Sequence, residues 1–244
     1  MPDATPYTFS FLSLFPEVLA PYLQASLLGK AQAKGLLQCR SLNPRDFSTN
    51  PHRKVDDTPY GGGPGMVLQC QPFLDAFASL APLAERTQVV VLTPTGQPFT
   101  HALSLQLAQQ ADELVFVCGH YEGFDERLMH LLPNVLPLSL GDFVLTGGEL
   151  PALCVADAVA RHLPGVVQQA DSVAQDSFYN GLLDYPHYTR PVEVGGLSVP
   201  PVLMSGNHQA IAAWRHEQAC QRTQTLRPDL WEAYQVSHPQ KPSR

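Results

Sequence analysis

Glycines that directly follow short apolar runs are the residues of this sequence best placed to bind a small molecule. Three such runs occur, at Val89–Leu92, Leu114–Cys118 and Val135–Leu140, and they lead into Gly96, Gly119 and Gly141. The runs are too short for helices and rich in β-branched residues, so they predict buried strands. Ligands of open α/β sheets bind beyond the carboxyl ends of parallel strands, where glycine allows the backbone to approach closely. We therefore expect the three turns to converge on one ligand.

A loop rich in glycine and proline could also contact a ligand. From Pro59 to Gly65 every residue except Tyr60 is glycine or proline, which excludes a regular helix or strand. Such loops can cradle phosphates, but the sequence has no G-K-[ST] here and no G-x-G-x-x-G that follows a strand. A loop that contacts a substrate or another subunit is the stronger interpretation, and phosphate binding stays open as the weaker one.

The elements that would position these turns alternate along the first two thirds of the chain, which predicts an α/β domain. Further strands are expected at Thr8–Leu14 and Leu36–Leu42. Helices are expected from Phe15, with a break or kink at Pro21, and at Ser26–Lys34, Gln71–Leu83, Thr100–Gln110, Phe124–Leu132 and Glu149–Leu163. In the last helix we expect four residues to face the core: Leu150, Leu153, Ala156 and Ala160.

The α/β pattern stops at Pro164, where we expect a domain boundary. Gly165–Gln175 is small and polar without periodicity, as in a linker or a segment that a partner orders. Beyond it, Asn207 is expected to cap a helix that reaches Gln224, and Pro228 to begin a shorter one. The expected organisation is a domain over residues 1–163, a linker over 164–175 and a second domain over 176–244.

Composition limits the class of protein. Of the 244 residues, 44% are hydrophobic and 15% are charged, which suits one large folded domain or a large and a small one. No apolar run reaches the roughly 18 residues that span a membrane, and the N-terminus lacks a signal-peptide pattern, so we expect a cytoplasmic protein without a membrane partner. The five scattered cysteines include no C-x-x-C pair, which indicates reduced core thiols.

Basic residues are clustered although the net charge is −7. Six of them lie between Val18 and Val55 against one acid, and five lie between Gly206 and Arg244 against three. Two basic patches on an acidic protein are typical of a polyanionic partner. An ordinary solvated surface explains the same counts equally well.

Five motifs, in order, resemble those of a known family. They are DDTPYGGGPGM (56–66), GHYEGFDER (119–127), SLGDFVLTGGELPA (139–152), DSFYNGLLDYPHYTRP (176–191) and VPPVLMSGNH (199–208). Together they closely resemble the bacterial tRNA (guanine-N1)-methyltransferases of the SPOUT class. The resemblance implies a parallel-sheet α/β domain with a trefoil knot, a small and mainly helical C-terminal domain that binds tRNA, and a homodimer. It also implies methyl transfer from S-adenosylmethionine to N1 of guanosine 37, 3′-adjacent to the anticodon, in support of reading-frame maintenance.

Carried over motif by motif, the resemblance implies that the three glycine turns hold S-adenosylmethionine, mostly through their backbone. The implied cofactor-binding residues are Leu92, Pro94, Gly96, Gly119, Tyr121, Gly123, Ser139, Leu140, Gly141, Asp142, Phe143, Val144, Leu145, Gly147, Gly148 and Pro151. Phe143 stands where many relatives carry tyrosine, and its ring can still pack on adenine. Glu122 could contact the methionine amine or help to hold Mg²⁺, but no carboxylate cluster fixes the ligands of a metal.

The implied reaction gives roles to further residues. Methylation at N1 needs a general base that removes the N1 proton and a donor or cation at O6. By resemblance Asp176 is the base, Arg161 stabilises O6, and Glu122 is the third residue of the catalytic set. From the residues alone, Asp176 could instead cap a turn and Arg161 could be a cation favoured at a helix C-terminus. In the family's arrangement Asp176 reaches a cofactor that the other subunit holds.

The implied RNA partner is the anticodon stem-loop, whose unpaired bases can be splayed out and read. Arg215 and Arg222 are expected on one helix face, where they would hold phosphates. The side chains of Tyr179, Tyr185 and Tyr188 either stack on bases or pack in the core or in a dimer. Two other functions stay open: a methyltransferase of the same class that acts on another RNA atom, and a non-catalytic RNA-binding protein that keeps the scaffold.

Overall fold

The computed structural model describes residues 5–167 and 176–238. The chain divides into two compact units, Met1–Gln168 and Gln169–Arg244. Most of the expected linker, 164–175, lies outside the described residues. Within the described ranges, no helix is both long enough and apolar enough to cross a lipid bilayer.

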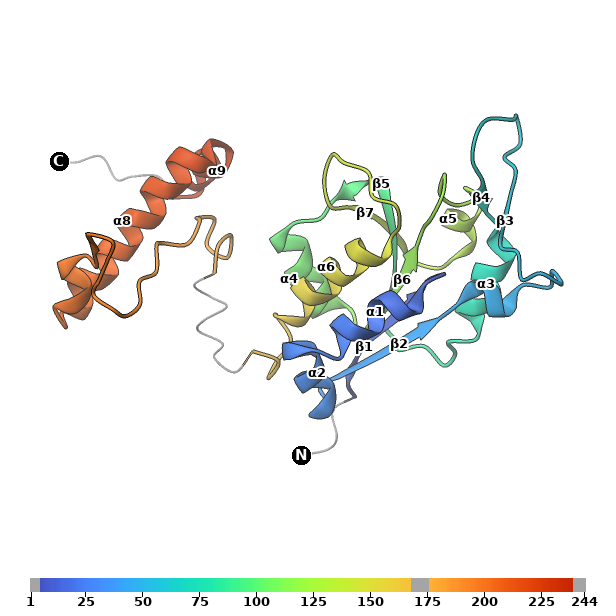
Figure 1. Ribbon diagram of the computed structural model, residues 1–244, viewed down its shortest axis with the longest axis horizontal. Helices are drawn as coiled ribbons and strands as arrows, with labels where there is room; N and C mark the ends of the chain where they lie inside the picture. Colours follow the sequence, from blue (N-terminus) through green and yellow to red (C-terminus); the bar gives the residue numbers. More distant parts are fainter. Residues whose placement is uncertain (1–4, 168–175, 239–244) are drawn as a thin grey trace. The chain divides into compact units, whose positions relative to one another are not determined.

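Unit 1 is built on a parallel sheet, as the sequence predicted. Its strands are β1 (Tyr7–Leu12), β2 (Leu37–Leu42), β5 (Thr87–Pro98), β6 (Glu113–Cys118) and β7 (Val135–Ser139). They form one five-stranded sheet in the order β2-β1-β6-β5-β7, in which every neighbouring pair is parallel (Figure 1). The three strands expected to carry glycine turns are therefore neighbours, so their carboxyl ends meet at one edge of the sheet.

Helices cover both faces of this sheet, which is why the central strands contain continuous apolar runs such as Val89–Leu92 and Leu114–Cys118. One face packs against α1 (Pro16–Leu23), α2 (Ser26–Ala33), α4 (His101–Gln110) and α6 (Glu149–Ala160). The other packs against α3 (Cys70–Ala78), α5 (Leu128–Leu131) and the 3₁₀ helix η1 (Pro44–Phe47). Side chains alternate between the two cores along each strand, as Val90 and Val91 do in β5. The domain is thus a three-layer α/β arrangement (Figure 1).

Several expected helices differ in extent from those observed. Pro21 does not end α1, which continues to Leu23 because Leu19 and Leu23 are buried and only one intrahelical hydrogen bond is lost. The helix expected at 124–132 is only α5, because hydrogen bonds with β4 hold the preceding residues in an extended turn. In α6, Leu150 is 57% exposed and does not face the core, contrary to the prediction.

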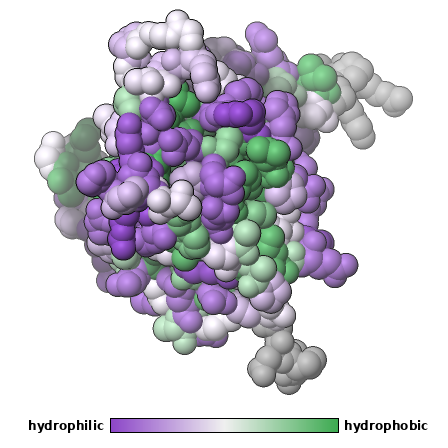
Figure 2. Space-filling model, turned by 90° about the vertical axis from the view of Figure 1, so that its right-hand side faces the viewer, coloured by the Kyte–Doolittle hydropathy of each residue, from purple (hydrophilic) through white to green (hydrophobic). Residues whose placement is uncertain are grey.

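The loop rich in glycine and proline connects two very short strands, β3 (Asp56–Asp57) and β4 (Val67–Leu68), which pair antiparallel. Its glycines at 61, 62, 63 and 65 all have positive φ, a conformation that glycine adopts without strain. The loop projects from unit 1 (Figure 1), and Figure 2 shows the largely hydrophilic face of the molecule at this end. Tyr60 at its tip is fully exposed, which leaves the loop open to a partner.

Unit 2 consists of a β-hairpin and helices. Its elements are β8 (Glu193–Val194), β9 (Leu197–Ser198), the 3₁₀ helix η2 (Pro201–Met204), α8 (His208–Leu226) and α9 (Pro228–Ser237). Asn207 caps α8 as predicted, since its side chain accepts a hydrogen bond from the Ala210 N–H at 3.1 Å. The buried Thr223 hydroxyl accepts a bond from Leu183 N–H at 2.8 Å, and this bond fixes the preceding segment to α8.

Candidate active site

A cavity of about 440 Å³ lies at the carboxyl ends of β5, β6 and β7. Its wall comes from three chain segments: 92–95 in β5, the turn after β6, and the stretch from 138 to 151 that leads from β7 into α6. The three glycine turns expected to converge therefore enclose one space. Neighbouring parallel strands explain the convergence, because each leaves the sheet at the same edge (Figure 1).

The first segment differs from the prediction, because β5 does not end at Leu92. The strand runs on to Pro98, and both Leu92 and Gln97 align with Leu138 of β7, so residues 93–96 bulge out of the ladder. Thr93, Pro94 and Thr95 line the cavity from this bulge. Gly96 does not line it; a Cβ there would lie 2.5 Å from the backbone N of Leu138, so this glycine permits close packing of two strands.

The second segment is the turn after β6, which includes a strained residue. Tyr121 has φ +58°, a left-handed conformation that costs non-glycine residues energy, and its ring stands exposed at the cavity. The β4 side of the loop holds this turn: Glu122 N–H donates to the Met66 carbonyl at 3.1 Å, and Leu68 N–H to the Gly123 carbonyl at 2.9 Å. A Cβ on Gly65 would overlap the Glu122 side chain, so the glycine-rich loop also packs against that carboxylate.

The third segment forms an apolar rim of the cavity and then hydrogen-bonds to the second segment. Phe143, Val144 and Leu145 are exposed large hydrophobic side chains that line the cavity. Beyond them, Gly148 N–H donates to the Gly119 carbonyl at 2.8 Å. A Cβ on Gly148 would lie only 2.7 Å from the Cα of Cys118, so only glycine allows these two backbones to cross here.

Glu149 ties the surrounding segments together. This carboxylate is 4% exposed at the start of α6, and it accepts hydrogen bonds from the Ser13 hydroxyl at 2.5 Å and His120 Nε2 at 2.8 Å. The end of β1, the turn after β6 and the start of α6 are thereby joined beside the cavity. Burial, with a smaller contribution from Glu149, raises the pKa of the adjacent Cys118 thiol well above its usual value, which agrees with the expected neutral core thiol.

The structure brings most of the expected cofactor residues together. All sixteen line the cavity except Gly96 and Asp142, and Glu122 lines it too. Sequence reasoning missed further lining residues, namely Thr93, Thr95, His120, Phe124, Glu126, Met129, Leu138 and Thr146. All of these lie within or next to the same three turns. The sequence therefore indicated which turns would line the cavity, but not every residue of each turn that would do so.

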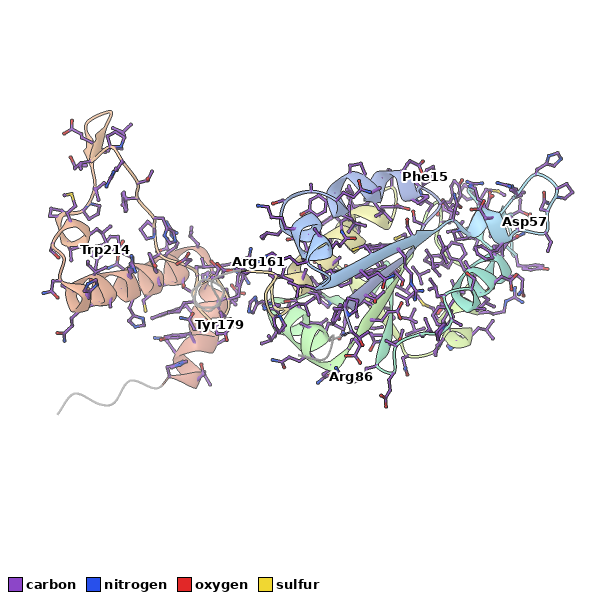
Figure 3. The ribbon with its side chains drawn as sticks, turned by 90° about the horizontal axis from the view of Figure 1, so that it is seen from below. Phe15, Asp57, Arg86, Arg161, Tyr179 and Trp214 are labelled. Atoms are coloured by element: carbon purple, nitrogen blue, oxygen red, sulfur yellow. The ribbon has the colours of Figure 1, made fainter. Side chains whose placement is uncertain are left out.

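The two residues expected to act on guanine lie in different units. Arg161 directly follows α6 in unit 1, where its N–H bonds to the Asp157 carbonyl at 3.2 Å (Figure 3). Asp176 is half-buried in unit 2 and lines a separate pocket of about 160 Å³ together with Asp184 and Arg215. Its backbone carbonyl accepts a weak bond from Tyr179 N–H at 3.4 Å. Their roles on the substrate stay predictions.

Comparison with known proteins identifies the family. The family model described as tRNA (Guanine-1)-methyltransferase TrmD matches residues 7–233. The chain belongs to the TrmD family. A tRNA (guanine-N(1)-)-methyltransferase of Synechococcus elongatus is 53% identical over 228 residues, which cover 93% of this chain and 96% of the relative. Another with that description, from Synechocystis, is 52% identical over 231 residues, covering 95% of this chain and 98% of the relative.

The cavity of this TrmD-family chain fits a methyl donor that carries positive charge. Its volume lies in the range of roughly 300–1,000 Å³ usual for ligand sites. Glu122 and Glu126 line it, and no lysine or arginine does among the described lining residues, so it is better suited to a sulfonium and an ammonium group than to phosphates. The exposed ring of Phe143 offers a flat surface for adenine.

For a magnesium ion, the structure of this TrmD-family chain gives less support than for the methyl donor. Within the part of the chain that the structure describes, no three side chains from His, Cys, Asp and Glu are grouped closely enough to hold a metal ion. Glu122 and Glu126 are the acidic residues at the cavity, and Mg²⁺ usually keeps several waters and takes one or two carboxylates from a protein, so these two would hold it only together with water and substrate.

Proposed function

We propose that this chain transfers the methyl group of S-adenosylmethionine to N1 of the guanosine at tRNA position 37. One observation carries the proposal: in a chain of the TrmD family, the bulge of β5 and the two glycine turns that follow β6 and β7 enclose a cavity with acidic residues and an apolar rim. S-adenosylmethionine, when bound, supplies an activated methyl group on a sulfonium. The protein must supply its position, the position of guanine and a route for the N1 proton.

In the proposed reaction Asp176 removes the proton from N1, and the Arg161 guanidinium donates hydrogen bonds to O6, where negative charge develops. A positioned base contributes about 10²- to 10⁴-fold in rate, and a donor aimed at developing charge contributes on a similar scale. Glu122 is proposed to face the positively charged amine of the donor, because its side chain lines the cavity and is held by the glycine-rich loop.

The knotted backbone and the homodimer belong to the same proposal. Two close backbone approaches support the knot: Gly96 lies against β7, and Gly148 against the end of β6, in both cases where a Cβ would not fit. A surface on α1 and α6 supports the dimer. Val18 and Tyr22 are exposed on α1, and Leu150 and Cys154 on α6, each pair spaced by one helical turn.

The test is transfer of labelled methyl to an unmodified tRNA transcript that carries G at position 37, run beside a transcript with A at that position. We expect 1-methylguanosine from the wild-type protein on the G transcript only. In the same assay Asp176→Asn should lower the rate by about 10²-fold or more, because an amide cannot accept the N1 proton.

Cofactor affinity, measured by calorimetry, is the control in this test and should be unchanged in Asp176→Asn. Product on the A transcript, or methylation of a ribose, would assign a different target atom. Tight tRNA binding without any methyl transfer would show an RNA-binding scaffold instead of an enzyme.

A further inference from the structure

A second large cavity lies within unit 2, where it shares Tyr185 and Arg215 with the pocket of Asp176. It has a volume of about 580 Å³ and lies between the extended segment 185–192, η2 and the N-terminal part of α8. Figure 3 shows the extended chain arching over α8, on which Trp214 is labelled. Neither the expected cofactor residues nor Arg161 and Asp176 line this cavity.

One side of the cavity carries stacked aromatic and cationic groups. The Arg215 guanidinium lies over the Tyr185 ring, 4.9 Å from its centroid, and the His187 ring is 4.7 Å from that of Tyr185. Tyr188, which is 49% exposed, leans on Trp214 at a centroid distance of 6.3 Å. These contacts hold flat groups at the cavity before any ligand arrives.

The rest of the cavity wall is apolar, and its charged residues are basic. The apolar residues come from the hairpin, η2 and α8, and they are Val192, Val199, Leu203, Met204 and Ile211. Arg190 and Arg215 are the charged lining residues, and none of the described lining residues is acidic. The nearby Asp184 carboxylate is already engaged by His187 Nε2 at 2.7 Å. A chain of net charge −7 thus presents a cationic, aromatic and apolar pocket at one place.

We propose that this cavity binds one unstacked nucleotide of the tRNA, with the base against the apolar wall and the Tyr188 ring and the phosphate at Arg190 and Arg215. The inference rests on the proposed function for the identity of the RNA. A nucleotide combines the two properties that the wall selects, a flat apolar face and a negative charge. An acidic peptide would match the arginines but would leave the aromatic and apolar wall without a planar partner.

The experiment is a double-mutant cycle between protein and RNA. A series of synthetic tRNAs, each lacking one unpaired base, is titrated by fluorescence anisotropy against the full-length wild type and Tyr188→Ala. Stacking on an aromatic side chain contributes about 5- to 150-fold in affinity. We expect one abasic position to weaken wild-type binding on this scale and to have no further effect in Tyr188→Ala.

Charge is tested separately with a matched pair on the same helix. Arg215→Gln should lower the slope of log affinity against log salt by about one, because one phosphate contact is lost. Arg227→Gln, at the other end of α8 and paired with Asp229, should leave the slope unchanged. Cofactor affinity, measured by calorimetry, should be the same in both variants and in Tyr188→Ala, which shows that unit 1 is intact.

The outcomes separate this inference from the proposed function. The wild type could bind and methylate tRNA while every abasic position lowers the affinity of Tyr188→Ala as much as that of the wild type. In that case the pocket does not hold a base, and the inference is wrong although the proposed function stands. If Arg215→Gln and Arg227→Gln change the salt slope equally, the phosphate contact is not at this pocket. If the wild type binds no tRNA, the proposed function and the inference fall together.

Discussion

Glu149 joins two distant segments of the chain beside the cavity. Its carboxylate accepts hydrogen bonds from Ser13 and His120, which come from two different segments of the chain. Glu149→Ala should lower the free energy of unfolding by about 1–3 kcal/mol, because both donors lose their partner in a buried place. Urea denaturation measures this change, and calorimetry should show weaker binding of S-adenosylmethionine because the turn carrying Tyr121 loses its hydrogen bond to the start of α6.

Glu126→Ala is the matched control for that prediction, since Glu126 also lines the cavity but is exposed. Its unfolding free energy should stay within about 0.5 kcal/mol of the wild type. Equal loss of stability in the two variants would mean that the carboxylate network around Glu149 has no special role.

Gly148→Ala tests the close crossing of two backbones. The added methyl group would lie 2.7 Å from the Cα of Cys118 and 2.8 Å from the backbone N of Gly119, so one segment must move. We expect at least a tenfold loss of affinity for S-adenosylmethionine in calorimetry, because the displaced atoms form the cavity wall. Gly62→Ala has no such neighbour and should lose only about 1 kcal/mol of stability from its positive φ, with cofactor affinity unchanged.

At the scale of residues, the turns were predictable and the residues that support them were not. Gly119 and Gly141 could be found because an apolar run followed by glycine is a local pattern. Glu149 could not, because its partners Ser13 and His120 are distant in sequence and only the fold brings them together. Gly96 was expected to face the ligand, but it packs against β7. This contact depends on how β5 and β7 align, and the sequence of neither strand alone specifies that alignment.

At the scale of elements, the exposed surface of α1 and α6 makes a prediction about assembly. Val18→Glu should convert the proposed dimer to a monomer in light scattering, because a charge at the centre of an apolar interface is costly to desolvate. Val236→Glu, on α9, is the control, since Val236 is 83% exposed and lies on unit 2. A dimer that survives Val18→Glu would place the interface elsewhere.

Some helix ends follow signals that are local in the sequence, although several helices differ in extent from the prediction. Thr100 caps α4 by accepting a hydrogen bond from Leu103 N–H, and Gly35 takes the left-handed conformation after α2. Helix faces were harder to predict. Leu150 was expected in the core from its spacing, but an apolar side chain on a helix can face either the core or another subunit, and periodicity does not distinguish them.

At the scale of the whole molecule, the proposal that Asp176 acts on a cofactor held by the other subunit can be tested with hybrid dimers. Asp176→Ala and Gly148→Ala chains are co-expressed with different tags, and dimers carrying both tags are purified. At a limiting concentration of S-adenosylmethionine each homodimer should have little activity, whereas the hybrid has one complete site and should recover about half of the wild-type rate per dimer. Inactive hybrids would place Asp176 and the cofactor within one subunit.

The sheet could be predicted as parallel but its strand order could not. Apolar runs that alternate with helices favour a parallel sheet with both faces covered, and the structure has this architecture. The order β2-β1-β6-β5-β7 depends on which strands pair across long stretches of sequence, and local patterns do not specify it. The bulge of β5 between Leu92 and Gln97 depends on the neighbouring strand in the same way.

The glycines in the cavity wall have a consequence for inhibitor design. Gly119, Gly147 and Gly148 line the cavity at places where a Cβ would meet other atoms, so substitution there damages the protein itself. A compound that bonds to the backbone of these turns therefore faces a surface that mutation cannot easily change. Drug resistance would have to arise at exposed lining side chains, among them Tyr121, Phe143 and Val144.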